Sequence, residues 1–157
     1  LVVVAATPGR WRAHCRMVLE GWPEGDPPKV VRQYYGLVAK LLYTQGPLGV
    51  LAPLRWAIFN GVGLFRPAPR EPMGRSGMAV WAVKSAALAA ENFVLAIRSH
   101  GFDTCMMEGM DSARVRRIVG APRGTLIPMV IGCGERAPDG VYGAQYRLPS
   151  ERTIHEI

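Results

Sequence analysis

The hydrophobic and polar positions of the chain begin with a strand-like pattern. Residues 1–6 read Leu-Val-Val-Val-Ala-Ala and are followed by Thr7-Pro8-Gly9. A short run of β-branched residues before a Pro-Gly turn predicts a buried strand. No positively charged segment precedes the run, which argues against a signal peptide. A chain that opens within a strand looks like a fragment, or like a domain without its amino-terminal part.

Helical spacing follows this strand. Residues 10–20 place apolar side chains on one face, and residues 29–43 do the same before Gly46-Pro47 interrupts the pattern. Residues 46–65 are almost wholly apolar and just reach the length of a bilayer span. Because Arg55 lies inside this run and arginine is costly in lipid, we expect a buried or interfacial helix rather than a transmembrane one.

The strongest helical pattern spans residues 78–100, after a stretch at 66–77 that is rich in Pro, Gly and Arg and predicts an exposed loop. The polar residues of the helix repeat every seven positions and form one narrow stripe: Lys84, Ser85, Glu91, Asn92, Arg98 and Ser99. A helix that is apolar on nearly all other sides is buried on nearly all sides. We therefore expect a central helix or a helix at a subunit interface.

The remaining pattern predicts two more strands with a helix between them. Residues 102–108 read as a strand, Asp111 can cap the helix that follows, and residues 125–133 form a second buried strand. Pro128 inside that strand indicates an edge or a bulge. The tail at 134–157 has turn residues and no further core-sized element. We expect it to pack on a partner chain.

Composition narrows the classes of protein. At 157 residues and 49% hydrophobic content, the chain suits one domain and is too apolar for a disordered tail. Lys and Arg outnumber Asp and Glu by 19 to 12, which gives a formal charge of +7. The arginines are scattered, and no helix-turn-helix, zinc-finger or RNP motif accompanies them. The charge alone is weak support for nucleic-acid binding, which we do not expect.

Familiar catalytic motifs are missing from the sequence. The three cysteines at 15, 105 and 133 include no C-x-x-C pair, which argues against a zinc ribbon or a disulfide framework. Reduced thiols in a cytoplasmic protein are the expectation, with Cys105 and Cys133 as small hydrophobes in apolar strands. The three histidines are scattered, and the sequence has no metal-ligand cluster, G-x-S-x-G or glycine-rich phosphate motif.

Two features could carry chemistry. Residues 106–111 read Met-Met-Glu-Gly-Met-Asp at a strand end before a helix, where free backbone N–H groups and thioethers can face a planar ligand. The alternative is an ordinary strand-helix connection. Residues 132–136 end in Arg136, and Arg147 follows eleven residues later. Two arginines beside flexible backbone could hold a phosphate, and the alternative is a solvated tail.

Taken together, these segments resemble the carboxy-terminal half of the flavin-dependent nitroreductase family. The matching stretches, between about residues 82 and 157, read ALAAENFVLAI, GFDTCMMEGMD, DSARVRRIVGAP and IPMVIGCGERAPDGVYGAQYRLP. The opening valines also resemble the family strand that follows a Pro-Ser/Asn-Gln-Pro-Trp stretch. Residues 10–77 match only loosely.

The resemblance implies a single nitroreductase-like α+β domain with a mixed, mainly antiparallel sheet wrapped by helices. It also implies an intertwined homodimer with the long central helix and FMN at the interface, and a tail that crosses the partner. The implied chemistry is ping-pong: NAD(P)H delivers hydride to flavin N5, and the reduced flavin passes electrons to a nitroaromatic, quinone or other small acceptor. The protein orients and tunes the flavin, without a dedicated catalytic acid or base and without a metal.

The same resemblance implies a set of cofactor-binding residues. A backbone N–H near Glu108 would face N5, Arg147 would bind the FMN phosphate, and Gln145 stands where relatives often have a second basic residue. The full set is Met106, Met107, Glu108, Gly109, Arg136, Gln145 and Arg147.

One departure leaves alternatives open. The family's amino-terminal Arg-x-Ser-x-Arg-type segment, which grips the phosphate and the pyrimidine side of the flavin, does not occur in this sequence. The leading hypothesis is an FMN oxidoreductase. A non-catalytic remnant that serves as a dimerisation or regulatory module is the second, and a peripheral membrane or nucleic-acid binder, based on the charge and residues 46–65, is the third.

Overall fold

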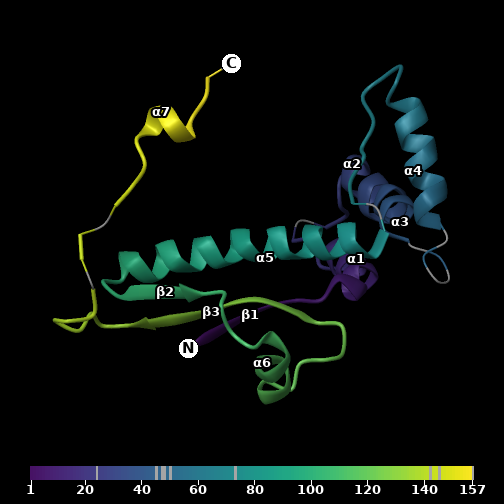
Figure 1. Ribbon diagram of the computed structural model, residues 1–157. Coiled ribbons are helices and arrows are strands. Elements are labelled where there is room, and N and C mark those ends of the chain that lie inside the picture. The colour runs from purple at the N-terminus through teal and green to yellow at the C-terminus, as the bar shows by residue number, and fades with distance from the viewer. Residues whose placement is uncertain are drawn as a thin grey trace.

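The centre of the molecule is a three-stranded antiparallel sheet. The computed structural model describes residues 1–23, 25–44, 46, 49, 51–72, 74–141, 143–144 and 146–156. The strands β1 (Val2–Ala6), β3 (Leu126–Gly134) and β2 (Asp103–Met107) lie in this order, so β3 is central (Figure 1). All three predicted strands are confirmed, and both pairings within the described residues are antiparallel.

Pro128 lies at a bulge, as its position in an apolar strand predicted. Val4 pairs with Met129 and Ala6 pairs with Leu126, so β3 carries one extra residue between these pairs. The pairing of β2 ends where Met107 meets Val130, so β2 does not reach Pro128. Proline has no backbone N–H, and Pro128 lies at a position where the strand pairing requires no hydrogen-bond donor.

Helix α5 (Gly74–Ser99) runs along one face of the sheet (Figure 1). Its Ala90 packs with Met129 and with Ile131, which is fully buried. The expectation of burial on nearly all sides is wrong within one chain, because the sheet covers only one face and leaves Leu88 71% exposed and Leu95 60% exposed. This result does not test the alternative that α5 lies at a subunit interface. Among the described residues, α5 is also the one helix long and apolar enough to cross a membrane, a test that core helices of soluble proteins pass as well.

The amino-terminal helices gather at the beginning of α5. After a 3₁₀ turn at Pro8–Arg10 they are α1 (Trp11–Glu20), α2 (Lys29–Gln33), a π-helical turn at Tyr34–Val38, α3 (Ala39–Tyr43) and α4 (Leu51–Val62). The segment from α2 to α3 is continuous, which confirms the helix predicted at 29–43. A small core joins Trp11 edge-to-face with Tyr43, at 5.6 Å between ring centroids.

Helix α4 lies on the outside of this group (Figure 1). None of its described side chains is buried, so of the expected buried or interfacial helix at 46–65 the buried alternative is wrong for the single chain, and the interfacial one stays a prediction. Its neighbours cover too little of a helix that is apolar on several sides. The loop predicted at 66–77 ends sooner than expected, because α5 already begins at Gly74.

Two short helices complete the fold. The Asp111 cap is confirmed: the backbone N–H of Arg114 donates to Asp111 Oδ1 at 2.9 Å and starts α6 (Ser112–Ile118). Helix α6 contacts β3 on the side of the sheet away from α5 (Figure 1). The tail leaves the sheet after β3 and extends away from it, and its described residues contain one helix, α7 (Ser150–Thr153).

Candidate functional site

The turn between β2 and α6 is anchored at both ends, by the last residue of the strand and by the residue that caps the helix. On one side, Met107 pairs with the buried Val130 and ends the strand. On the other side, the Asp111 carboxylate caps α6. Glu108 and Gly109 connect these two points and are exposed. The predicted turn therefore exists, with its backbone open to solvent.

Gly109 shows why this turn suits a ligand. A Cβ built on it would meet nothing within 4 Å, and its φ lies outside the left-handed region that favours glycine. Its backbone N–H also has no hydrogen-bond partner among the residues that the structure describes. Neither packing nor backbone conformation within this chain requires glycine here. The open space at Gly109 leaves room for the close approach of a planar group, and a flavin ring would fit against this turn.

The thioethers before the turn are accessible as well. Met106 is 52% exposed and Met107 is 37% exposed, because β2 is an edge strand with one free side. Their polarizable sulfur atoms can contact an aromatic ring. The chemistry available here is contact with a ring and a hydrogen bond from the peptide edge.

Arg147 lies in the exposed tail. Its Nη1 donates to the carbonyl oxygen of Tyr146 at 3.0 Å. Within the described part of the chain no carboxylate pairs with it, so its guanidinium is available to an anion. Gln145 lies outside the described residues.

One chain does not bring the turn and the tail together. The tail begins after Gly134, which pairs with Asp103 at the start of β2. The turn at Glu108 follows the other end of β2, roughly 13 Å along the strand at 3.3 Å per residue. The turn and the start of the tail therefore lie at opposite ends of β2 in this chain.

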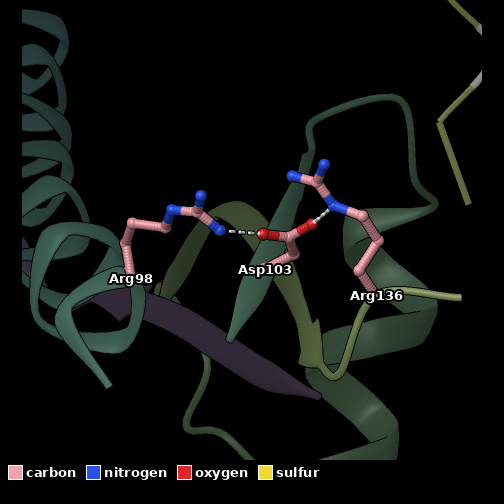
Figure 2. Close-up of polar contacts among 3 residues, drawn as sticks. All are labelled: Arg98, Asp103 and Arg136. Carbon is pink, nitrogen blue, oxygen red and sulfur yellow. Dashed lines mark hydrogen bonds and ion pairs between the residues drawn. The ribbon is translucent and has the colours of Figure 1, made fainter. Parts of the chain in front are cut away.

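Arg136 has a partner that the sequence did not reveal. Asp103 Oδ2 accepts a hydrogen bond from Arg136 Nε, and Asp103 Oδ1 accepts one from Arg98 Nη1 at 2.5 Å (Figure 2). These hydrogen bonds and positive charges, Arg136 first, lower the pKa of the Asp103 carboxyl below its ordinary value. The Asp103 carboxylate in turn raises the pKa of Arg136. The expected role of Arg136 as an anion contact stays a prediction.

Two open cavities flank this ion-pair cluster. One of about 600 Å³ is lined by Arg98, Asp103 and Arg136 together with Val94 and Leu95 of α5. Another of about 400 Å³ also reaches Asp103 and Arg136 from the side of Cys105 and Cys133. The cluster is therefore solvent-accessible from both sides.

The cysteines differ from the prediction. Cys105 and Cys133 do lie in strands, but both side chains are exposed because they occupy the edge strand and the end of β3. Cys105 pairs with Gly132, so the two thiols point to opposite faces of the sheet. Cys15 is buried, and burial raises the pKa of its thiol. The described residues contain no group of His, Cys, Asp and Glu that could hold a metal ion.

A sequence profile described as the Nitroreductase family matches residues 7–135. The match includes residues 10–77, which resemble the family only loosely, and it ends before Arg136 and Arg147. Among curated proteins, an NADH dehydrogenase from Thermus thermophilus is 30% identical over 82 residues, which are 52% of this chain and 39% of that protein.

Solved structures agree in fold. A nitroreductase family protein from Streptococcus pneumoniae superposes with a TM-score of 0.60 at 17% identity, covering 93% of this chain and 58% of the other. The enone reductase CLA-ER, from a gut-bacterial fatty acid saturation metabolism, gives 0.58 at 14% identity, with 99% and 61% covered. A protein from Exiguobacterium sibiricum, solved in complex with FMN, gives 0.50 at 18% identity, with 96% and 57% covered.

The chain thus spans about two fifths of the curated relative and about three fifths of these structures. The family profile nevertheless covers most of it, from the end of β1 to the end of β3. The sheet, the long helix and the open turn described above all lie in or next to the matched region. The chain belongs to the nitroreductase family.

Proposed function

We propose that this chain is an FMN-dependent oxidoreductase, which passes electrons from NAD(P)H to a nitroaromatic, quinone or similar small acceptor. The observation that carries the proposal is the open turn at Glu108–Gly109, whose glycine nothing in the chain itself requires. Family membership and the FMN complex of the Exiguobacterium protein support it. The names of two relatives, an NADH dehydrogenase and an enone reductase, support the electron donor and the reaction class.

The turn would hold the ring of the cofactor. Its free backbone N–H groups would donate to the ring edge, and the thioethers of Met106 and Met107 would cover part of the ring. FMN, when bound, supplies the two-electron chemistry of a ping-pong reaction, accepting a hydride from NAD(P)H and reducing the acceptor. The residues of this chain supply orientation and polarity, without a dedicated acid or base.

Arg147 would bind the FMN phosphate, and a homodimer would complete the site. Its guanidinium has the fork geometry that suits phosphate. Because the tail leaves the sheet at the opposite end from the turn, we propose that each tail reaches the turn of the partner. The exposed apolar face of α5, with Leu88 and Leu95, supports a subunit interface. The proposal also places the protein in the cytoplasm, without nucleic acid or membrane as a partner.

The decisive experiment is an FMN titration, followed by flavin fluorescence, of the protein and of graded variants at Gly109. Gly109→Ala and Gly109→Val add volume where the chain has open space, so the unfolding free energy should change by less than about 0.5 kcal/mol. Crowding the ring should cost about 1–3 kcal/mol in binding, more for valine than for alanine. The absence of FMN binding in the micromolar range, or unchanged binding by Gly109→Val, would overturn the proposal.

A second pair of variants tests the phosphate contact. Arg147→Ala should weaken FMN binding by about 1.5–3 kcal/mol if it removes a charged hydrogen bond. Arg152→Ala is the matched control, because this arginine also lies in the exposed tail and has no ion pair among the described residues. Equal effects of the two substitutions would show only a general loss of positive charge.

The exposed face of α5 also favours a second candidate, a dimerisation module that binds no flavin. Leu88→Glu should convert a dimer to monomers under either proposal, as measured by sedimentation. A stable, colourless dimer that does not oxidise NAD(P)H in the presence of FMN would favour the module over the enzyme.

A further inference from the structure

Three residues from three separate elements meet at the point where the tail leaves the sheet. Arg98 lies in the last turn of α5, Asp103 is the first residue of β2, and Arg136 lies two residues beyond β3. Each carboxylate oxygen of Asp103 accepts a hydrogen bond from a different arginine, as Figure 2 shows. We call this group the clasp.

Asp103 is the hub of the clasp. Its side chain is 26% exposed, whereas those of Arg98 and Arg136 are 64% and 56% exposed. Arg98 donates to one oxygen of the carboxylate from the helix, and Arg136 donates to the other oxygen. Asp103 also pairs with Gly134 in the last rung of the ladder, so its backbone is fixed as well.

Few hydrogen bonds hold the described part of the tail. We define the arm as residues 137–156. Among the residues that the structure describes, the bond from Arg136 to Asp103 is the hydrogen bond that joins residues 135–156 to the rest of the chain. The other bonds of this stretch stay within it. Among the described residues of the arm, the large apolar side chains are exposed and belong to neither core cluster: Val141, Tyr146, Leu148 and Ile154.

We propose that Asp103 is a positioning residue that sets the course of the arm through Arg136. Fixing the chain at Arg136, two residues beyond β3, restricts the directions in which the arm can leave the sheet. Such restriction raises the effective concentration of a distant group at its target and lowers the ordering cost of binding. The inference rests on the proposed function in one respect, namely that the arm carries Arg147 to the flavin phosphate of the partner.

The two arginines offer a matched pair for the first test, made on the flavin-free protein. Arg136→Gln and Arg98→Gln each remove one bond to the same carboxylate, but only Arg136 leads into the arm. We expect chymotrypsin to cut after the exposed Tyr146 about threefold to tenfold faster in Arg136→Gln, and less than twofold faster in Arg98→Gln. Arg136→Lys should restore part of the protection. Equal rates in the two glutamine variants would overturn the proposal, whatever the outcome with flavin.

FMN affinity then separates positioning from direct contact. If Asp103 positions the arm, Asp103→Asn and Arg136→Gln both weaken FMN binding several-fold. If Arg136 instead bound the phosphate directly, Asp103→Asn would free its guanidinium and leave affinity equal or higher, and only Arg136→Gln would weaken binding. That second pattern overturns the proposal. A wild-type protein that binds no FMN would refute the proposed function, while the cleavage rates would still decide the role of the clasp.

Discussion

The two ends of helix α5 support very different parts of the molecule. At its carboxy-terminal half, α5 covers the sheet, and the shared core includes the fully buried Ile131. At its beginning lies the helical projection, which we define as residues 29–70. Of this projection, Ala39 and Tyr43 are buried, whereas large side chains such as Leu37 and Trp56 are about 60% exposed. The sheet shares one core with α5, whereas the projection packs on α1 and the start of α5 through a second small core that contains Ala39 and Tyr43.

Charge separates the two regions in the same way. The projection contains six Lys and Arg residues and no Asp or Glu, so it accounts for six of the seven formal charges of the chain. In the rest of the chain, the opposite charges nearly balance. The clasp and the Asp111 cap both lie in this balanced part, because each needs a carboxylate. Within the projection, Arg55 and Arg70 bind carbonyl oxygens, whereas Arg32 pairs with Asp26 outside it.

The largest difference should appear on truncating the core. Ile131→Ala removes a fully buried side chain from the central strand and should cost about 2–5 kcal/mol of unfolding free energy. Leu37→Ala, its control in the projection, should cost less than about 0.5 kcal/mol because this side chain is 60% exposed. Urea denaturation followed by circular dichroism measures both. Similar costs would show that Leu37 is buried in solution, contrary to its exposure in this structure.

The next largest loss of stability should be confined to the projection. Arg55 of α4 donates from Nη1 to the carbonyl oxygens of Leu41 and Leu42, at 2.8 and 2.5 Å, near the end of α3. Its Nη2 is buried without a partner among the described residues, and burial lowers the pKa of the guanidinium. Arg55→Met should therefore lose about 1–2 kcal/mol of local stability, since a cation stabilises a helix C-terminus.

Amide hydrogen exchange measures this effect where it occurs. Exchange should accelerate in α3 and stay unchanged in β3, because the substituted side chain does not touch the sheet. Arg66→Met, on an exposed arginine with no side-chain hydrogen bond among the described residues, should leave both regions unchanged. Acceleration in β3 would mean that the two regions unfold together.

The sequence predicted the features that depend on neighbouring residues, and it missed a contact between residues that are distant along the chain. The opening strand, the bulge at Pro128 and the cap at Asp111 depend on neighbours along the chain, and all three are confirmed. The clasp joins Asp103 to a residue 33 positions away, and only the pairing of β2 with β3 brings the two together. A signal was present in Arg98 and Asp103, five residues apart around the helix end, but nothing in the sequence marks Arg136 as their partner.

Exposure was predicted least well, because periodicity reports which faces are apolar and not which elements cover them. The pattern of α5 is that of a helix surrounded by protein, yet one sheet covers one face. The site shows the same limit. The turn at Glu108–Gly109 was predicted from adjacent residues, whereas its distance from the tail depends on which end of β2 meets Gly134. The resemblance to a family suggests a cofactor, and only the fold shows that the turn and the start of the tail lie at opposite ends of β2.

The smallest expected effect lies beside the candidate site. Asp111→Ala removes the cap of α6 and should cost about 1 kcal/mol, because the backbone N–H of Arg114 loses its acceptor. Asp111→Asn keeps an acceptor oxygen and should cost much less. Because Asp111 also fixes the far end of the turn, the alanine variant should weaken FMN binding more than its small loss of stability explains. Equal FMN affinity in both variants would mean that the turn is held by β2 alone, and the sheet would then order the site without help from α6.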